Sequence, residues 1–206
     1  MSNQEHAAEH VHKDDIGTRM GVWLFLFTEL LLFGGLFFIY SVYRFMHQAD
    51  FHLAAKEMNI IIGTLNTAIL LTSSMTMALS ITAIQRNNKK LSIIMQIITM
   101  VLGIAFLVNK LFEWLAEIHN GNFPGSEILL AKGPGQILFF GLYYTMTGLH
   151  GLHVIIGTVL IGVMTRFTFN GVITSEKYVK LEAAGLYWHL VDIIWIFLFP
   201  LFYLIT

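Results

Sequence analysis

The chain has 206 residues, of which 56% are hydrophobic and only 12% are charged, and its mean hydropathy is +0.68. This composition is typical of an integral membrane protein and excludes an ordinary soluble domain. The formal net charge of -1 argues against a nucleic-acid-binding protein, because there is no basic excess to neutralise phosphates. The lack of cysteine excludes disulfides and thiolate metal sites.

The hydropathy pattern predicts one polar tail followed by one membrane domain. Residues 1–18 mix charges of both signs and contain no apolar core, so we expect a polar cytoplasmic tail there and a single domain over residues 19–206. Five apolar segments follow, each long enough for the about 20 residues that cross a hydrocarbon core. They run approximately over residues 20–45, 59–85, 91–117, 135–165 and 179–205. Because unpaired backbone groups are not tolerated in lipid, each segment must be a helix, and the prediction is an all-α integral membrane protein, a bundle of five transmembrane helices.

The distribution of basic residues predicts the orientation of this bundle. The side that holds the N-terminus and the second and fourth connections carries Lys13, Arg19, Arg86, Lys89, Lys90, Arg166, Lys177 and Lys180. The opposite side carries Arg44, Lys56 and Lys132. Since basic residues gather on the cytoplasmic side, we expect a cytoplasmic N-terminus and a periplasmic C-terminus.

The first apolar segment contains one acidic residue, Glu29, with no basic residue within a helical turn. An ionisable group at membrane depth is costly and therefore marks a candidate functional site. Two interpretations remain open for Glu29. It is a proton-holding or lipid-facing acid, or it is a neutral carboxyl group that hydrogen-bonds a neighbouring helix.

The next two segments differ in their polar residues. The second contains no charge and is rich in glycine, serine and threonine, which is typical of a helix that packs closely against others. In the third, Lys110, Glu113 and Glu117 fall at spacings of three, four and seven, which places them on one helix face near the outer end. Lys110 and Glu113 could form an ion pair, and the favoured interpretation is an outer charge cluster in which water solvates the end of the helix.

The last two segments carry histidine pairs. His150 and His153 share one face of the fourth segment, and His189 and Asp192 share one face of the fifth, with Glu182 about two turns earlier. A metal or haem site between the two helices is one interpretation, since histidines from facing helices can converge on a metal. The bulky residues around His189 favour the other, a buried interhelical hydrogen-bond network of all five residues.

At these residues the chain resembles subunit III of the haem-copper terminal oxidases. The resemblance rests on "TGLHGLHVIIG" followed by "LEAAGLYWHLVDIIWIFLF", with "LFLFTELLLF", "LNTAILLTSSMTMA" and "LFEWLAE" in the same order before them, and it covers residues 19–205. It departs from the longer members of the family, which have two further helices before the one that contains Glu29. The short form resembles five-helix bacterial versions, and the missing helices leave open what forms the second wall of the family's lipid cleft.

The resemblance implies a non-catalytic subunit of the bacterial inner membrane that supports proton uptake and the working life of a respiratory oxygen reductase. It implies no metal or cofactor in this chain, haem and copper in partner subunits I and II, and bound phospholipid. Glu29 matches the family's membrane-embedded glutamate beside the lipid cleft, and Arg166 matches a ligand for a lipid phosphate. The short motif "FTE" at residues 27–29 favours the cytochrome c type of oxidase.

Other functions are open at this point. Within the same family, a quinol oxidase subunit or an accessory subunit of a nitric oxide reductase fits as well, and the chain could join a larger respiratory supercomplex. A metal-binding membrane enzyme with ligands at His150, His153 and His189, or a proton-coupled transporter that uses Glu29, belongs to a different class.

Overall fold

All regular secondary structure in the described part of the chain is helical. The structure is a computed structural model that describes the backbone of residues 3–205 and the side chains from Arg19 onward. The elements are α1 (Asn3–Met46), α2 (Gln48–Ala55), α3 (Ile60–Gln85), α4 (Lys89–His119), α5 (Glu127–Lys132), α6 (Pro134–Phe169) and α7 (Val179–Tyr203). Five stretches are long and apolar enough to cross a membrane, namely Arg19–Met46, Ile60–Gln85, Lys89–His119, Pro134–Phe169 and Val179–Tyr203. The predicted bundle of five transmembrane helices is therefore confirmed.

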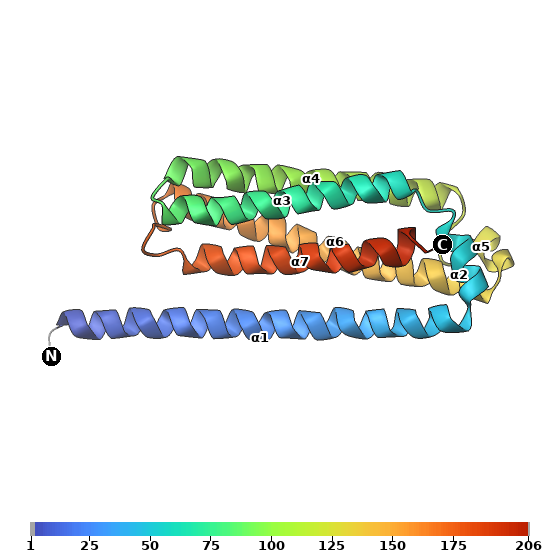
Figure 1. Ribbon diagram of the computed structural model, residues 1–206, viewed down its shortest axis with the longest axis horizontal. Helices are drawn as coiled ribbons and strands as arrows, with labels where there is room; N and C mark the ends of the chain where they lie inside the picture. Colours follow the sequence, from blue (N-terminus) through green and yellow to red (C-terminus); the bar gives the residue numbers. More distant parts are fainter. Residues whose placement is uncertain (1–2, 206) are drawn as a thin grey trace.

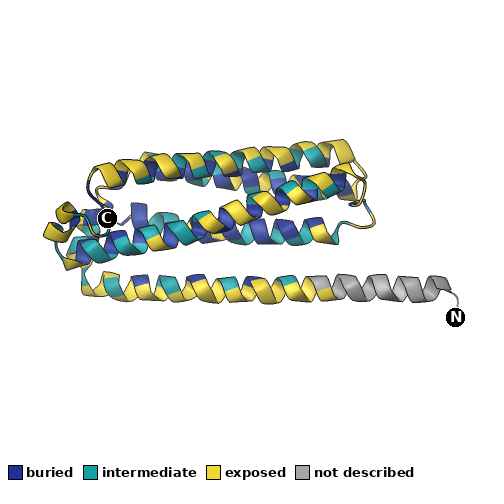
Figure 2. Cartoon of the chain, turned by 180° about the vertical axis from the view of Figure 1, so that it is seen from behind, coloured by how far each residue is buried: buried dark blue, intermediate teal, exposed yellow. Residues whose placement is uncertain are grey.

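Four of the long helices form a closed ring, and α1 lies beside it (Figure 1). Around the ring, α3 contacts α4, α4 contacts α6, α6 contacts α7, and α7 contacts α3. The main contacts of α1 are with α6 and α7. Figure 2 shows the consequence, because the surface of α1 is mostly exposed while the ring helices turn buried residues toward one another.

Local sequence signals set the ends of these helices. The side chains of Asn59, Asn88 and Ser126 each accept a hydrogen bond from a backbone N–H in the first turn of α3, α4 and α5, which satisfies donors that have no partner inside the helix. Gly121 and Gly171 follow the last residues of α4 and α6 with φ of 80° and 76°. This left-handed conformation suits glycine and ends a helix.

Two short helices, α2 and α5, lie at the same end of the bundle as the C-terminus (Figure 1). Both lie between the predicted apolar segments, and helices of eight and six residues are too short to show a clear periodicity in the sequence. They are ordered by burial of Phe51 and Leu129. Gly135, at the start of α6, allows α2 to approach closely, since a Cβ atom there would lie 2.3 Å from a carboxyl oxygen of Asp50.

The segment predicted as a polar tail continues the first helix in the structure. Helix α1 begins at Asn3 and runs without a break into the apolar stretch that starts at Arg19. The side chains of residues 1–16 and of Thr18 lie outside the described part of the chain, so the predicted solvation of this segment stays a prediction.

Candidate functional site

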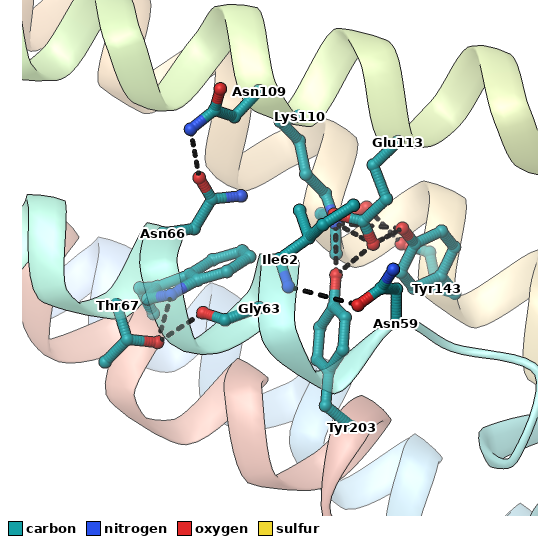
Figure 3. Close-up of polar contacts among 12 residues, drawn as sticks. Asn59, Ile62, Gly63, Asn66, Thr67, Asn109, Lys110, Glu113, Tyr143 and Tyr203 are labelled. Carbon is teal, nitrogen blue, oxygen red and sulfur yellow. Dashed lines mark hydrogen bonds and ion pairs between the residues drawn. The ribbon is translucent and has the colours of Figure 1, made fainter.

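The densest group of buried polar residues joins α4, α6 and α7 near the end of the bundle that holds α2, α5 and the C-terminus (Figure 1). We name this end the outer end and the opposite end the inner end. We call the group the Lys110 cluster, and it consists of Lys110, Glu113, Tyr143 and Tyr203 (Figure 3). The ammonium group of Lys110 donates to Glu113 Oε1 at 3.3 Å, to the Tyr143 hydroxyl at 2.9 Å and to the Tyr203 hydroxyl at 2.7 Å. The Tyr143 hydroxyl donates to Glu113 Oε1 at 2.6 Å, and the Tyr203 hydroxyl donates to the same oxygen.

This cluster is closed to solvent and uses every donor of the lysine. The side chains of Lys110 and Glu113 are only 5% and 2% exposed. The ring of Trp195 lies 5.3 Å from the Lys110 nitrogen, which adds a cation–π contact. Two buried charges are tolerated when they are paired and hydrogen-bonded, so the cluster fixes three helices together and leaves no free donor on the lysine for a ligand.

The location of the cluster corrects one expectation from the sequence. Lys110, Glu113 and Glu117 were predicted to form a solvated helix end, yet all three are buried. The reason is tertiary, because tyrosines from α6 and α7 cover the first two. Glu117 instead accepts a hydrogen bond from Asn122 at 2.8 Å.

A second group of polar contacts connects Asn122 with Glu57 and Lys132 at the surface of the bundle. Asn122 also donates to Glu57 at 2.9 Å, and Lys132 forms an ion pair with Glu57 at 2.8 Å. The Lys132 and Glu57 side chains are 26% and 38% exposed. This outer ion pair ties the loop after α2 to α5, and water is available to solvate it.

Glu29 is paired across helices rather than isolated. Its carboxyl oxygen Oε2 lies 2.8 Å from Nε2 of His153 on α6, and Nδ1 of His153 lies 2.7 Å from the carbonyl oxygen of Leu149. The Glu29 and His153 side chains are 14% and 10% exposed. The contact holds the middle of α1 to the ring, and a single proton can be shared between the two groups.

His150 lies in a different environment from His153, although the two are three residues apart. Its ring is fully buried, with ring centroids 5.6 Å from Phe106 and 5.2 Å from Trp195. Neither ring nitrogen has a hydrogen-bond partner among the described residues. His150 is therefore held by aromatic packing and does not join His153 in a polar contact.

The remaining predicted network residues are also separate. His189 lies 2.7 Å from the Ser74 hydroxyl on α3, and Glu182 pairs with Arg19 at 3.2 Å near the inner end of α1. Both carboxyl oxygens of Asp192 are buried without a hydrogen-bond partner among the described residues.

The structure thus corrects the prediction that all five of these residues form a single hydrogen-bond network. The sequence shows which residues share a helix face, but the neighbour of each face is set by the packing. His153 faces α1, His150 faces the interior of the ring, and His189 faces α3.

The contact between α3 and α7 contains polar pairs that were not predicted residue by residue from the sequence. The indole N–H groups of Trp188 and Trp195 donate to the hydroxyls of Ser73 and Thr67 at 3.1 and 3.0 Å. A row of hydroxyl residues on one apolar segment and of tryptophans seven residues apart on another was the available signal. These bonds satisfy polar atoms that would otherwise be buried in an apolar interior.

Arg166 lies on the exposed surface of α6 at the inner end of the bundle. No hydrogen bond or ion pair joins its side chain to Glu29 or to any other described side chain. The structure therefore does not bring the two predicted lipid-cleft candidates together.

Two cavities open along the contact between α1 and α7. The inner one, of about 220 Å³, is lined by Arg19, Trp23 and Glu182 among others. The outer one, of about 320 Å³, is lined by Tyr40 and Arg44 among others. Each cavity joins a basic residue to apolar walls at one end of α1.

No group of three or more histidine, aspartate or glutamate side chains in the described part of the chain is arranged to hold a metal ion. His150 and His153 point to different helices, and His189 is bonded to Ser74. The described residues therefore do not assemble the two-helix metal site that was the alternative interpretation of these histidines.

Comparison with known proteins matches the chain along its whole length. The family model described as cytochrome c oxidase subunit III matches residues 1–206. Cytochrome c oxidase subunit 3 of Thermostichus vulcanus is 34% identical over 201 residues, which cover 97% of this chain and 93% of that protein. Cytochrome bo(3) ubiquinol oxidase subunit 3 of Pseudomonas aeruginosa is 29% identical over 97% of this chain and 90% of that protein.

A fused protein is also similar. The haem-copper oxidase subunit I+III of Aeropyrum pernix is 31% identical over 94% of this chain, and the match covers 23% of that longer protein. The match falls on a part of that protein comparable in length to this chain.

Proposed function

Because the chain belongs to the cytochrome c oxidase subunit III family, we propose that it is the non-catalytic subunit III of a respiratory haem-copper oxygen reductase that oxidises cytochrome c. The family and the five spans make the chain a multi-pass protein of the bacterial inner membrane. Subunit III associates with subunit I in this family, and a fused I+III relative exists. Haem and copper belong to subunits I and II in this proposal, and this chain carries no cofactor of its own.

One observation carries the non-catalytic role. Apart from Asp192, whose buried carboxyl group has no hydrogen-bond partner among the described residues, the ionised residues that a redox or transport site would need are engaged in contacts that hold helices together. Lys110 and Glu113 form hydrogen bonds with each other and with two tyrosines, and Glu29 forms one with His153. Such contacts stabilise an assembly, because breaking one leaves an uncompensated buried group.

A quinol oxidase is the second candidate for the parent enzyme. It is favoured by the similarity to the bo(3) subunit of Pseudomonas aeruginosa, which spans 97% of this chain. The two candidates differ in their electron donor, which subunits I and II would supply. Oxygen uptake by the purified complex with reduced cytochrome c or with a quinol distinguishes them directly.

Phospholipid binding is the second part of the proposal, and the seam between α1 and α7 is the place we assign to it. Arg44 lines the outer cavity of this seam and has no ion-pair partner among the described side chains, and a guanidinium group suits the geometry of a phosphate. Arg19 lines the inner cavity, where it is paired with Glu182 at 3.2 Å. Arg166 supplies a further cation at the inner end of α6, outside these two cavities.

Orientation follows from the same basic residues. We place the N-terminus and the connections after α3 and α6 in the cytoplasm, and α2, α5 and the C-terminus on the periplasmic side, in agreement with the excess of lysine and arginine at the first of these two ends. Glu29 then lies within the membrane between them. There it supports proton uptake by the catalytic subunit, and its partly exposed side chain is reachable from lipid.

Removing the chain tests the non-catalytic role. The oxidase purified without it should keep its initial oxygen reduction and its haem and copper, but its activity should fall within fewer turnovers than that of the complete complex. Adding back the purified chain should restore the working life. Loss of haem or copper from the depleted complex, or iron or copper bound stoichiometrically to the isolated chain, contradicts the proposal.

A hydrophobic carbodiimide tests the role of Glu29. The reagent attacks protonated carboxyl groups in apolar surroundings, and Glu29 is more exposed at the seam than Glu113 is in its cluster. Labelling should occur first at Glu29 and disappear in Glu29→Gln, whereas Asp192→Asn should label as the unsubstituted chain does. Preferential labelling of Glu113 or Asp192 contradicts this assignment.

A further inference from the structure

Helix α1 buries much less of itself in its own chain than the other spans do. Only 11% of its most apolar window is buried, compared with 28% to 50% for the corresponding windows of α3, α4, α6 and α7. Each ring helix contacts two ring neighbours, whereas α1 contacts the ring from one side (Figures 1 and 2). The opposite side of α1 is therefore available to something outside this chain.

The two sides of α1 are distinguished by their residue spacing. The side toward the ring carries Leu26, Phe33 and Tyr40, which are buried and seven residues apart. The other side carries two neighbouring rows of exposed residues, each at alternating spacings of three and four. We call one of them the outer stripe; the other row runs from Gly21 through Gly35 to Met46. The outer stripe consists of Met20, Leu24, Phe27, Leu31, Gly34, Phe38, Ser41 and Phe45. This alternation is the heptad spacing with which one helix packs along another.

Gly34 makes a gap in the middle of the outer stripe, and Gly35 makes a similar gap beside it in the neighbouring row. A Cβ atom built at either position has nothing within 4 Å, so no part of this chain requires the absence of a side chain. Glycine inside a helix is less favourable than alanine, and it is common in membrane helices where another helix approaches closely. Large exposed residues flank Gly34, since Leu31 and Phe38 lie three and four residues away. A surface of this shape fits a helix better than mobile lipid chains.

The fused relative indicates which helices are available to occupy it. Subunits I and III are one chain in the Aeropyrum pernix protein, so in that protein helices of subunit I adjoin one end of the part that matches this chain. The end helices of that part correspond to α1 and α7. Of these, α7 already has α1, α3 and α6 around it, whereas α1 has a free side.

Resting on the proposed function, we propose that the outer stripe of α1 is the surface on which the transmembrane helices of catalytic subunit I dock. A bulky apolar side chain of subunit I sits over Gly34, between Leu31 and Phe38. The ring helices then have no direct part in this contact, and α1 joins subunit I to the ring through Glu29 and His153.

Gly34→Leu tests the docking surface without disturbing the fold of this chain, because the site is open within the chain. Gly21→Leu is the matched control, since Gly21 also has nothing within 4 Å, lies on the same helix and is not part of the outer stripe. Gly34→Leu should lower the amount of subunit I that co-purifies with the chain by about tenfold, as expected for overpacking a close contact, and Gly21→Leu should not. Equal co-purification with both variants overturns the proposal.

Crosslinking identifies the neighbour directly, because the chain contains no cysteine. In the complete complex, a photoreactive maleimide on Leu31→Cys or Phe38→Cys should crosslink to subunit I. The comparison is Leu111→Cys, at a groove of about 430 Å³ between α4 and α6 that is the strongest competing surface. Crosslinks to subunit I from Leu111→Cys alone, or adducts with lipid alone from the α1 positions, overturn the docking assignment.

The same experiment separates this inference from the proposed function. If subunit I does not co-purify with the unsubstituted chain, the proposed function itself fails. If it co-purifies but is reached only from the groove between α4 and α6, the subunit assignment holds and only the docking surface is wrong.

Discussion

Replacing Glu113 with glutamine removes the negative charge of the Lys110 cluster while keeping the size of the side chain. Lys110 would then keep its two tyrosine partners but lose its counter-ion, at a site where its side chain is only 5% exposed. Removing one partner of a buried ion pair typically costs about 3–5 kcal/mol, because the remaining charge is uncompensated. We therefore expect Glu113→Gln to lower the free energy of unfolding by about 3–5 kcal/mol.

The assay is reversible unfolding in mixed micelles, followed by tryptophan fluorescence. Trp195 is a suitable reporter, since its ring lies 5.3 Å from the Lys110 nitrogen. Glu57→Gln is the matched control, because it removes the same charge from an exposed pair with Lys132 and should cost about 0–1 kcal/mol.

A double variant distinguishes the cost of leaving Lys110 as an unpaired buried charge from the loss of the favourable interaction between the two residues. Lys110→Met combined with Glu113→Leu, made in a background of Tyr143→Phe and Tyr203→Phe, removes both charges together with the two hydroxyls that bond them. It should recover most of the stability lost in Glu113→Gln, since apolar replacement of a whole buried pair is often neutral when no partner is left unsatisfied. The reasoning is refuted if Glu113→Gln costs no more than Glu57→Gln, or if the double variant is less stable than Glu113→Gln.

Two further substitutions test contacts at the outer end of the bundle. Gly135→Ala should loosen α2, because the new Cβ would lie 2.3 Å from a carboxyl oxygen of Asp50. Faster proteolysis of the loop between α1 and α3 measures it, and Gly141→Ala, at a site with nothing within 4 Å, should leave the rate unchanged. Tyr40→Phe removes the hydroxyl that donates to the carbonyl oxygen of Leu201 and should cost about 1 kcal/mol of unfolding free energy. A melting temperature unchanged by Tyr40→Phe would show that this bond contributes nothing.

Glu29 illustrates how far the sequence could lead at a single residue. Its position in the middle of an apolar segment predicted either a functional acid or a neutral carboxyl group that bonds another helix. Both interpretations rest only on the depth of Glu29 in the membrane. The partner, His153, is 124 residues away, and nothing local to either residue indicates the pairing. Depth follows from the chain, but the direction that a side chain faces relative to other helices does not.

Lys110 and Glu113 show again that the sequence does not reveal the tertiary neighbours of a side chain. Their spacing correctly placed them on one face, yet it predicted solvated charges. The tyrosines that bury them lie in α6 and α7. The sequence does not show which group the hydroxyl of a tyrosine in an apolar segment bonds, so such a tyrosine cannot be distinguished from any other core aromatic residue.

The sequence by itself determined the five spans and the family. Both depend on the order of residues along the chain, because lipid forces every spanning segment to bury its backbone hydrogen bonds within itself. The tertiary structure alone decided which buried polar groups meet, that His150, His153 and His189 face three different neighbours, and that α1 stands beside a closed ring with one side free. Those features depend on the rotation of each helix about its axis and on the choice of neighbours, which side-chain packing between helices sets and hydropathy leaves undetermined.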